Sequence, residues 1–304
     1  MFIHSGNHLG DTWYFEENGK IHMFYLTCPN SIERHTAWAI AHAVSSDLIH
    51  WEKAGIILTR GIPDSYDGIC PATGSVLHFN DKYWLAYTGN WNGPIPTVAI
   101  AQSDDLFNWK KIPENPVTRI DERFYAETIF PGDRNWLHWR DPFLFTDRGK
   151  VFHYVCAKRK DGWGTLGYAE TTDMRHWKVL PPPEVEPVVA ELECPQVYKY
   201  ENKYYLVFSS CTDLFSEFIQ QKYQFPKNRW TCFSMVGESI YGPFKMIGDG
   251  VVIPYDYPVQ PYACQVVFFH QKPFLMGTVW NDLQDFVTDP IPLQFSEFGL
   301  KVQE

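Results

Sequence analysis

The chain repeats one short pattern five times, and this repeat restricts its fold more than any other feature of the sequence. Each copy is a run of apolar and aromatic residues, a polar turn that ends in lysine, and a second apolar run. Runs rich in β-branched and aromatic residues on both sides of a short polar turn predict β-hairpins. The copies are identified by their lysines, which are Lys20, Lys82, Lys150, Lys203 and Lys272.

A third apolar run and a second short motif follow three of the hairpins. The runs at 39–44 and 97–101 are examples of the third strand. The motif is an aspartate that directly follows a serine, threonine or aspartate and precedes a tryptophan by four residues. Its copies are Asp47 with Trp51, Asp105 with Trp109, and Asp173 with Trp177. About four strands per unit is the size of a propeller blade.

The spacing of the hairpin lysines fits five such blades. Consecutive lysines are 62, 68, 53 and 69 residues apart, so five units of this length occupy nearly all of the 304 residues. No Gly/Ser-rich linker or low-complexity segment divides the chain. We therefore predict an all-β protein, a five-bladed β-propeller with about four antiparallel strands per blade, which forms a single domain over residues 1–304.

Charge and cysteine usage restrict the partners and the compartment. The net charge of −10 disfavours nucleic acid and favours a neutral or cationic ligand. The seven cysteines include no CxxC pair and mostly lie in apolar runs, which predicts buried free thiols in a reducing compartment. The N-terminus has no basic region followed by an apolar stretch, and no apolar run is long enough to span a membrane. We expect a cytoplasmic protein without membrane contact.

Carboxyl side chains recur at one position of the repeat. In a propeller the first strand of each blade lines the central channel, so equivalent residues of these strands meet around one axis. Counting nine or ten residues back from each hairpin lysine gives Asp11, Thr73, Asp141, Glu193 and Tyr262. Acids at the start of a strand also serve as loop caps, but three of them around one channel favour a site.

Three clustered carboxyls suit the hydrolysis of a glycosidic bond. This reaction needs a carboxylic acid to protonate the leaving oxygen and a carboxylate that acts as nucleophile or base. A third carboxylate stabilises the positive charge of the transition state. Crowding raises the pKa of at least one of the three, which helps it to stay protonated near neutral pH. No cofactor is expected, and the scattered histidines predict no catalytic metal, although an ion in the channel is left open.

Further polar and aromatic residues are predicted to bind the substrate. Arg140 precedes Asp141 and is able to hold it ionised or to contact sugar hydroxyls. Aromatic residues make up 17% of the chain, and their rings suit the apolar faces of sugars as well as the packing between blades. The predicted binding residues are Arg140, Thr73, Trp91, Trp139, Tyr262 and His8.

Two short motifs, Arg140-Asp141-Pro142 and Glu193-Cys194-Pro195, are in register with the repeat. They resemble the Arg-Asp-Pro and Glu-Cys motifs of the furanosidase clan of propeller glycoside hydrolases, and most closely those of glycoside hydrolase family 32. The resemblance covers roughly residues 8–280. It implies a transition-state role for Asp141, an acid/base role for Glu193 and a nucleophilic role for Asp11.

The sequence also departs from the family. Asp11 follows His8-Leu9-Gly10 where the family has Asn-Asp-Pro-Asn-Gly, and Thr73-Gly74-Ser75 stands where it has Ser-Gly-Ser. Five blades fill the chain, so the C-terminal β-sandwich of the family is not expected.

Three functions are therefore weighed. The first is a retaining enzyme that acts on a β-fructofuranosyl linkage of an oligosaccharide or other glycoside. The second is an inverting enzyme like those of family 43, an arabinofuranosidase or xylosidase, in which Asp11 activates water. The third is a non-catalytic sugar-binding propeller. A separation of roughly 5–5.5 Å between the two working carboxyls indicates retention, and roughly 6.5–9.5 Å indicates inversion. A homo-oligomer is left open.

Overall fold

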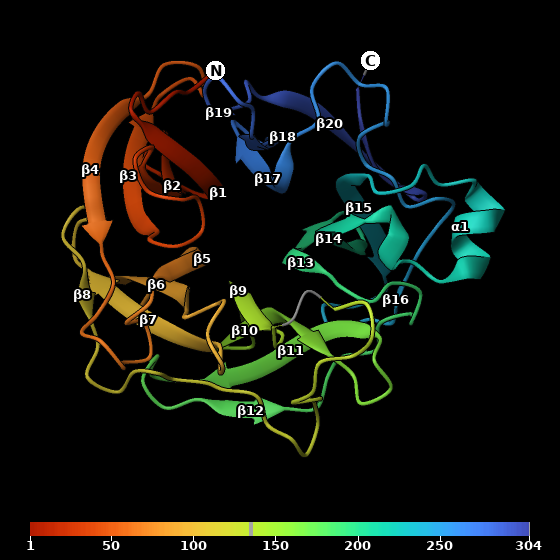
Figure 1. Ribbon diagram of the computed structural model, residues 1–304, viewed down its shortest axis with the longest axis horizontal. Coiled ribbons are helices and arrows are strands. Elements are labelled where there is room, and N and C mark those ends of the chain that lie inside the picture. The colour runs from red at the N-terminus through yellow and green to blue at the C-terminus, as the bar shows by residue number, and fades with distance from the viewer. Residues whose placement is uncertain (134–135, 304) are drawn as a thin grey trace.

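In the computed structural model, which describes residues 1–133 and 136–303, the strands form five antiparallel sheets around a central axis (Figure 1). Blade 1 contains β1 (Asn7–Glu17), β2 (Lys20–Pro29), β3 (Ala39–Ser45) and β4 (Glu52–Leu58). Blade 2 contains β5 (Pro71–Phe79), β6 (Lys82–Gly89), β7 (Thr97–Ser103) and β8 (Lys110–Lys111). Blade 3 contains β9 (Trp139–Asp147), β10 (Lys150–Lys158), β11 (Gly164–Thr171) and β12 (Lys178–Leu180).

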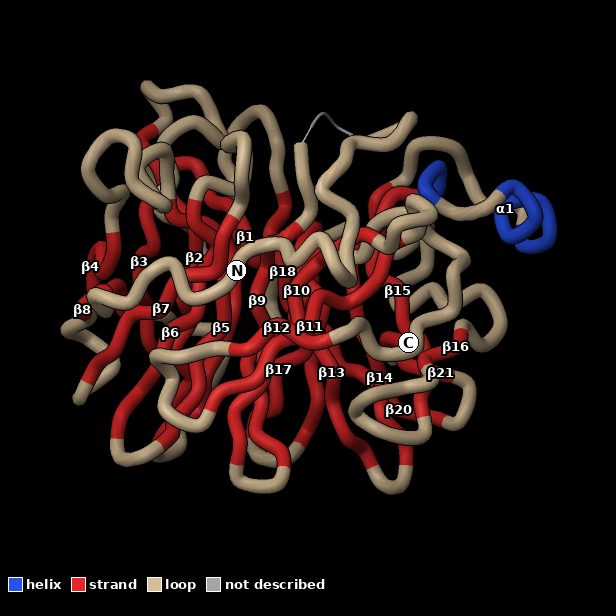
Figure 2. Tube along the Cα trace, turned by 90° about the horizontal axis from the view of Figure 1, so that it is seen from below, coloured by secondary structure: helices blue, strands red, loops and turns tan. Residues whose placement is uncertain are grey.

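The last two blades include additional short elements. Blade 4 contains β13 (Glu193–Tyr200), β14 (Lys203–Cys211), β15 (Trp230–Gly237) and β16 (Phe244–Lys245). Blade 5 contains β17 (Tyr262–Phe269), β18 (Lys272–Val279), β19 (Phe286–Val287), β20 (Ile291–Ser296) and β21 (Gly299–Val302). A 3₁₀ turn (Thr212–Leu214) and helix α1 (Glu217–Tyr223) lie between β14 and β15, and α1 projects from the rim of the ring (Figure 2).

The predicted five-bladed propeller is confirmed. Each hairpin lysine is the first residue of the second strand of its blade, and blades 1 to 4 have four strands in sequential order. Blade 5 has an additional short strand, β19, which pairs with β18.

The aspartate–tryptophan motif closes the turn after the third strand. In blade 1 the Asp47 carboxylate accepts hydrogen bonds from the backbone N–H groups of Ile49 and His50, at 2.9 and 2.7 Å. A hydroxyl also takes part in this turn. It is that of Ser45, two residues before the aspartate, and it accepts a hydrogen bond from the Leu48 N–H at 2.9 Å. The Trp51 indole N–H donates to the Leu48 carbonyl at 3.1 Å. Blades 2 and 3 repeat these contacts.

Aromatic and aliphatic side chains fill the interfaces between blades. Between blades 3 and 4, Phe145 and Tyr154 pack in one cluster with Phe208 and Phe233. The seven cysteines are free and buried, as predicted. Among the described residues, no helix has the length and apolar character needed to cross a membrane.

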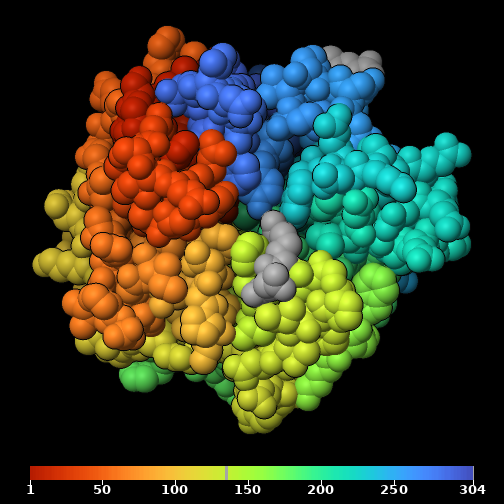
Figure 3. Space-filling view, in the orientation of Figure 1, coloured from red at the N-terminus to blue at the C-terminus, as the bar shows by residue number. Residues whose placement is uncertain are grey.

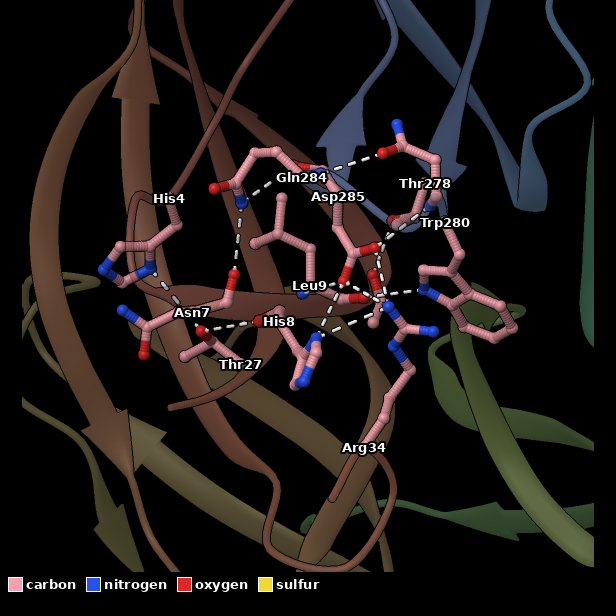
Figure 4. Close-up of polar contacts among 12 residues, drawn as sticks. His4, Asn7, His8, Leu9, Thr27, Arg34, Thr278, Trp280, Gln284 and Asp285 are labelled. Atoms are coloured by element: carbon pink, nitrogen blue, oxygen red, sulfur yellow. Dashed lines mark hydrogen bonds and ion pairs between the residues drawn. The ribbon is translucent and has the colours of Figure 1, made fainter. Parts of the chain in front are cut away.

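The ring is closed where the first blade meets the last. Phe2 and Val287 exchange two backbone hydrogen bonds of 3.0 and 2.9 Å. The buried Asp285 carboxylate, which follows β18, accepts from the Leu9 N–H at 3.1 Å and from the Arg34 guanidinium at 2.8 Å (Figure 4). In the space-filling view the red N-terminal and blue C-terminal segments lie against each other (Figure 3).

We expect Asp285→Ala to lower the free energy of unfolding by about 2–4 kcal/mol, because it leaves the Arg34 charge and a buried N–H without their acceptor. Equilibrium denaturation in urea measures this change. Asp104→Ala is the matched control, since its ion pair with Lys82 is exposed to solvent and is worth at most about 1 kcal/mol. Equal losses of unfolding free energy in the two variants would contradict the role of Asp285 in closing the ring.

Candidate active site

The innermost strand of every described blade has a register shift near the channel. The shifts follow Leu9, Ala72, Arg140, Glu193 and Tyr262. A bulge of this kind bends the strand and redirects a side chain. Three residues within the bulges, Asp141, Cys194 and Ala263, have φ angles of 61°, 49° and 49° in the left-handed region. The positions obtained by counting back from the hairpin lysines therefore lie within or directly beside these bulges.

The bulges surround a cavity of about 200 Å³. Its polar lining is formed by Asp11, Thr73, Arg140, Asp141, Glu193, Tyr262 and His35. Its wider lining is formed by Gly10, Leu26, Ala72 and the tryptophans Trp38, Trp91, Trp136, Trp230 and Trp280. A carboxyl-containing cavity with aromatic walls is suited to a sugar ring, because polar groups contact its hydroxyls and aromatic faces contact its C–H groups.

Most of the residues predicted for the site meet at this cavity. The three carboxyl residues line it together with Thr73, Arg140, Trp91 and Tyr262. The Thr73 hydroxyl donates a hydrogen bond to Asp11 Oδ2. The Tyr262 hydroxyl donates to Glu193 Oε2 at 2.5 Å. These contacts connect strands of different blades and fix the orientation of two carboxyls.

Trp139 and His8 do not line the cavity. The Trp139 side chain is buried, and its indole N–H donates to the Thr118 hydroxyl at 3.1 Å. It lies one residue before Arg140 in β9, and side chains alternate along a strand, so it points into the core between blades 2 and 3. His8 faces the ring closure, where its Nδ1 lies 3.3 Å from Asp285 Oδ2 (Figure 4).

Asp11 lies in an environment that favours its neutral form. Burial raises the pKa of Asp11 to about 6, and the neighbouring Asp141 carboxyl contributes to the rise. Hydrogen bonds from Thr73 and Cys194 and the charge of Arg140 act in the opposite direction. The Asp141 carboxylate is fixed by the Cys194 N–H at 3.0 Å. Asp11 is therefore ionised at neutral pH and becomes protonated in mild acid.

Arg140 lies beneath the carboxyls and contacts several of them. Its Nη2 donates to Glu193 Oε1 at 3.0 Å and also to Glu191 Oε1. Its Nε lies 3.7 Å from Asp141 Oδ2. Its Nη1 lies 3.1 Å from His138 Nδ1. Glu191 and His138 were not identified in the sequence, although each stands two residues before a predicted site residue, the spacing that places two side chains on one face of an extended segment.

The aromatic walls come mainly from loops, which the repeat does not place. The His35 ring lies 5.5 Å from that of Trp38 and 5.3 Å from that of Trp280. Trp280 in turn packs on Tyr262 at 4.7 Å. The sequence therefore gives little indication of which loop tryptophans line the cavity, because the loops of different blades share no common register.

Two groups of side chains in the described part of the chain bring three ligand-type atoms together. In the first, formed by His138, Cys156 and Glu191, the Arg140 guanidinium already contacts the histidine nitrogen and the carboxylate. In the second, formed by Asp11, Asp141 and Cys194, burial raises the pKa of the Cys194 thiol well above its usual range. In the first group the guanidinium thus takes the place that a metal would need. The second group is better suited to reactions of its carboxyls than to binding a metal through a thiolate.

The raised pKa of Asp11 predicts that Asp11→Asn stabilises the fold. A carboxyl whose folded pKa exceeds its unfolded value destabilises the folded state at pH values above both. At pH 7.5 the neutral amide should therefore raise the free energy of unfolding by about 2 kcal/mol. The gain should disappear near pH 3, where Asp11 is protonated in both states. Urea denaturation at both pH values measures it, and a loss of stability at pH 7.5 would contradict the expected electrostatics.

Comparison with known proteins agrees with this geometry. Residues 11–297 match the family model described as the glycosyl hydrolases family 32 N-terminal domain. A sucrose-6-phosphate hydrolase of Lactococcus lactis is 30% identical over 207 residues, which are 64% of this chain and 40% of that protein. An invertase of Schizosaccharomyces pombe is 29% identical over 181 residues, which are 53% of this chain and 28% of that protein. The chain thus spans less than half the length of these relatives.

Solved structures share the fold. The sucrose-6-phosphate hydrolase of Lactobacillus gasseri has a TM-score of 0.75 and 21% identity, and the match covers 96% of this chain and 60% of that one. The levansucrase of Bacillus subtilis has a TM-score of 0.74 and 18% identity, with 99% of this chain and 87% of that one covered. Because the family model spans nearly the whole chain and its motif residues converge on one cavity, the protein belongs to glycosyl hydrolase family 32.

Proposed function

We propose that the protein is a β-fructofuranosidase-like glycoside hydrolase that cleaves a fructofuranosyl linkage with retention. The observation that carries this proposal is the convergence of Asp11, Asp141 and Glu193 on one aromatic-walled cavity. Family membership supports the reaction class, and the names of the relatives, sucrose-6-phosphate hydrolase and invertase, support a sucrose-like substrate. We further propose that residues 1–304 act as a single propeller catalytic domain. The free buried cysteines suit a reducing compartment, which supports a cytoplasmic location.

We assign to the three carboxyls the roles that the family resemblance implies, and their surroundings support this assignment. Asp11, oriented by Thr73, attacks the anomeric carbon as a carboxylate while Glu193 gives its proton to the leaving oxygen. The bond to the leaving sugar breaks as the ester to Asp11 forms. Glu193 then takes a proton from water, which attacks the anomeric carbon and releases Asp11. Asp141, held by the Cys194 N–H, stabilises the positive charge that develops on the sugar ring.

The cavity fits the end of a sugar chain. A volume of about 200 Å³ with five tryptophans in the lining suits one furanosyl ring, with the rest of the substrate at the mouth. Trp280 and Trp230 pack on Tyr262, which contacts Glu193, so the aromatic rings on the side of the proton donor are placed to receive the leaving sugar. The preferred substrate is thus a short, terminal β-fructofuranoside.

Asp11→Asn and Glu193→Gln should each lower kcat/KM on sucrose or an alkyl β-fructofuranoside by about 10³-fold or more, because each removes a group that takes part in bond exchange. Initial rates on purified protein measure the loss. The matched control is Glu238→Gln, which changes an exposed carboxylate that pairs with Lys203 and does not line the cavity. Unchanged rates in the first two variants would refute the catalytic roles and favour a sugar-binding propeller.

The stereochemical outcome tests retention separately. With Asp11 as nucleophile, the first fructose released should be the β-anomer, and ¹H NMR during early turnover detects it. Release of the α-anomer would instead indicate that Asp11 activates water, as in the family 43 type of reaction.

The pH dependence should report Asp11. A nucleophile must be ionised, and burial raises the pKa of Asp11 to about 6, so kcat/KM should fall as the pH is lowered through about 6. A rate profile from pH 4 to 9 on an alkyl fructoside measures this limb. An acid limb near pH 4 would mean that the free enzyme ionises Asp11 like an exposed carboxyl.

A further inference from the structure

A fourth carboxyl, Glu191, lies beside the three already assigned, and the proposed reaction does not use it. Glu191, His138 and Arg140 are almost completely buried, with exposed fractions of 4, 2 and 3%. The carbonyl of Glu191 accepts a hydrogen bond from the Ser210 hydroxyl at 2.9 Å, which fixes its backbone. A charge that is buried this deeply needs a partner, and its partner here is Arg140.

Two matched pairs of residues form this cluster. His138 and Arg140 are separated by the buried Trp139, and Glu191 and Glu193 by the buried Leu192. Because side chains alternate along an extended chain, both members of each pair face the same way. The two pairs meet at the interface between blades 3 and 4, where β9 and β13 are in contact.

One guanidinium nitrogen serves both glutamates. Arg140 Nη2 donates to Glu191 Oε1 and to Glu193 Oε1, the second at 3.0 Å. Arg140 Nη1 donates to His138 Nδ1 at 3.1 Å, which requires that nitrogen to be unprotonated. Burial lowers the pKa of His138, so the imidazole is neutral at this contact. Arg140 is therefore the cation that the two glutamates share.

The titratable and charged groups in and around this cluster come from several elements. They are His138, Arg140 and Asp141 of the β9 segment, Cys156 and Lys158 of β10, Cys194 of β13, Asp11 of β1, Tyr262 of β17 and the loop residue Asp133. Lys158 and Asp133 form their own buried ion pair of 2.7 Å, so they add little net charge. The thiols of Cys156 and Cys194 are neutral, because burial raises the pKa of each.

Sharing the guanidinium has a consequence for acid catalysis. An arginine paired with Glu193 alone would favour its ionised form, but a general acid must carry its proton when the substrate is bound. Glu191 supplies a second negative charge on the same nitrogen and offsets the arginine. We propose that Glu191 is a positioning residue that pairs with Arg140 and thereby keeps Glu193 protonated for transfer to the leaving group, an inference that rests on the proposed function of Glu193.

Glu191→Gln tests this inference, because glutamine keeps the shape and a hydrogen-bond acceptor but removes the charge. The basic limb of the kcat/KM profile should move to lower pH by about one unit, since Glu193 then has Arg140 Nη2 without a competing negative charge on that nitrogen. At pH 7.5, kcat on an alkyl β-fructofuranoside should fall by about tenfold. On a nitrophenyl β-fructofuranoside it should fall by less than about twofold, because a nitrophenolate leaves without a proton. Glu191→Asp, which keeps the charge, should retain the wild-type basic limb.

Equal losses on both substrates with an unshifted basic limb would overturn the inference and leave Glu191 a purely structural role. If Glu191→Gln does not fold, the wild-type profile decides, because a basic limb below pH 6 on the alkyl fructoside would mean that Glu193 is not held protonated. Glu193→Gln is measured on the same two substrates. If that variant is as active as the wild type on the alkyl fructoside, the proposed function itself fails, whatever Glu191 does.

Discussion

The arrangement of the cavity depends on one buried arginine. Four carboxyl groups, those of Asp11, Asp141, Glu191 and Glu193, lie at or beside the inner ends of the strands. The last three are buried, and Asp11 is half-buried. Burying several like charges together is strongly unfavourable unless a counter-charge is held in place among them. Arg140 meets this need, since it contacts three of the four directly. The planar guanidinium offers several donors in fixed directions, which a lysine could not reproduce.

The propeller supplies the rigidity that such an arrangement requires. Asp11 and Asp141 lie within bulges of inner strands, and Glu193 lies directly beside one. Regular hairpin pairing follows each bulge along its strand and fixes it. Contacts between blades then set the distances between these carboxyls. The Tyr262 hydroxyl donates a hydrogen bond to Glu193, and the Thr88 hydroxyl accepts one from the Asp141 N–H at 2.8 Å. The strained backbone of Asp141 is therefore held by neighbours on both sides, the condition under which such strain persists at functional sites.

The fold and the polar part of the site could be predicted because both follow the repeat. Hairpin lysines mark the register of each blade, so counting back from them reaches the bulge residues Asp11, Thr73 and Asp141. Trp139 is next to Arg140 in a strand, so the alternation of side chains turns it away from the cavity that it was predicted to line. Glu191 precedes its strand and belongs to no motif, and His35 and Trp280 lie outside the repeated strands. Their positions depend on tertiary packing, which local patterns do not report.

The closure of the ring determines the geometry of the site as well as the stability of the fold. Two hydrogen bonds join the β1 segment that carries Asp11 to blade 5 (Figure 4). The Thr278 hydroxyl donates to the Gly10 carbonyl at 2.5 Å, and the Trp280 indole N–H donates to the Leu9 carbonyl at 2.7 Å. Trp280 also packs on Tyr262, the partner of Glu193. Asp11 and Glu193 belong to blades that are not adjacent in sequence order, so their separation is fixed partly through this contact between the first and last blades. An opening of the ring would therefore move Asp11 and Glu193, the two proposed catalytic carboxyls, relative to each other.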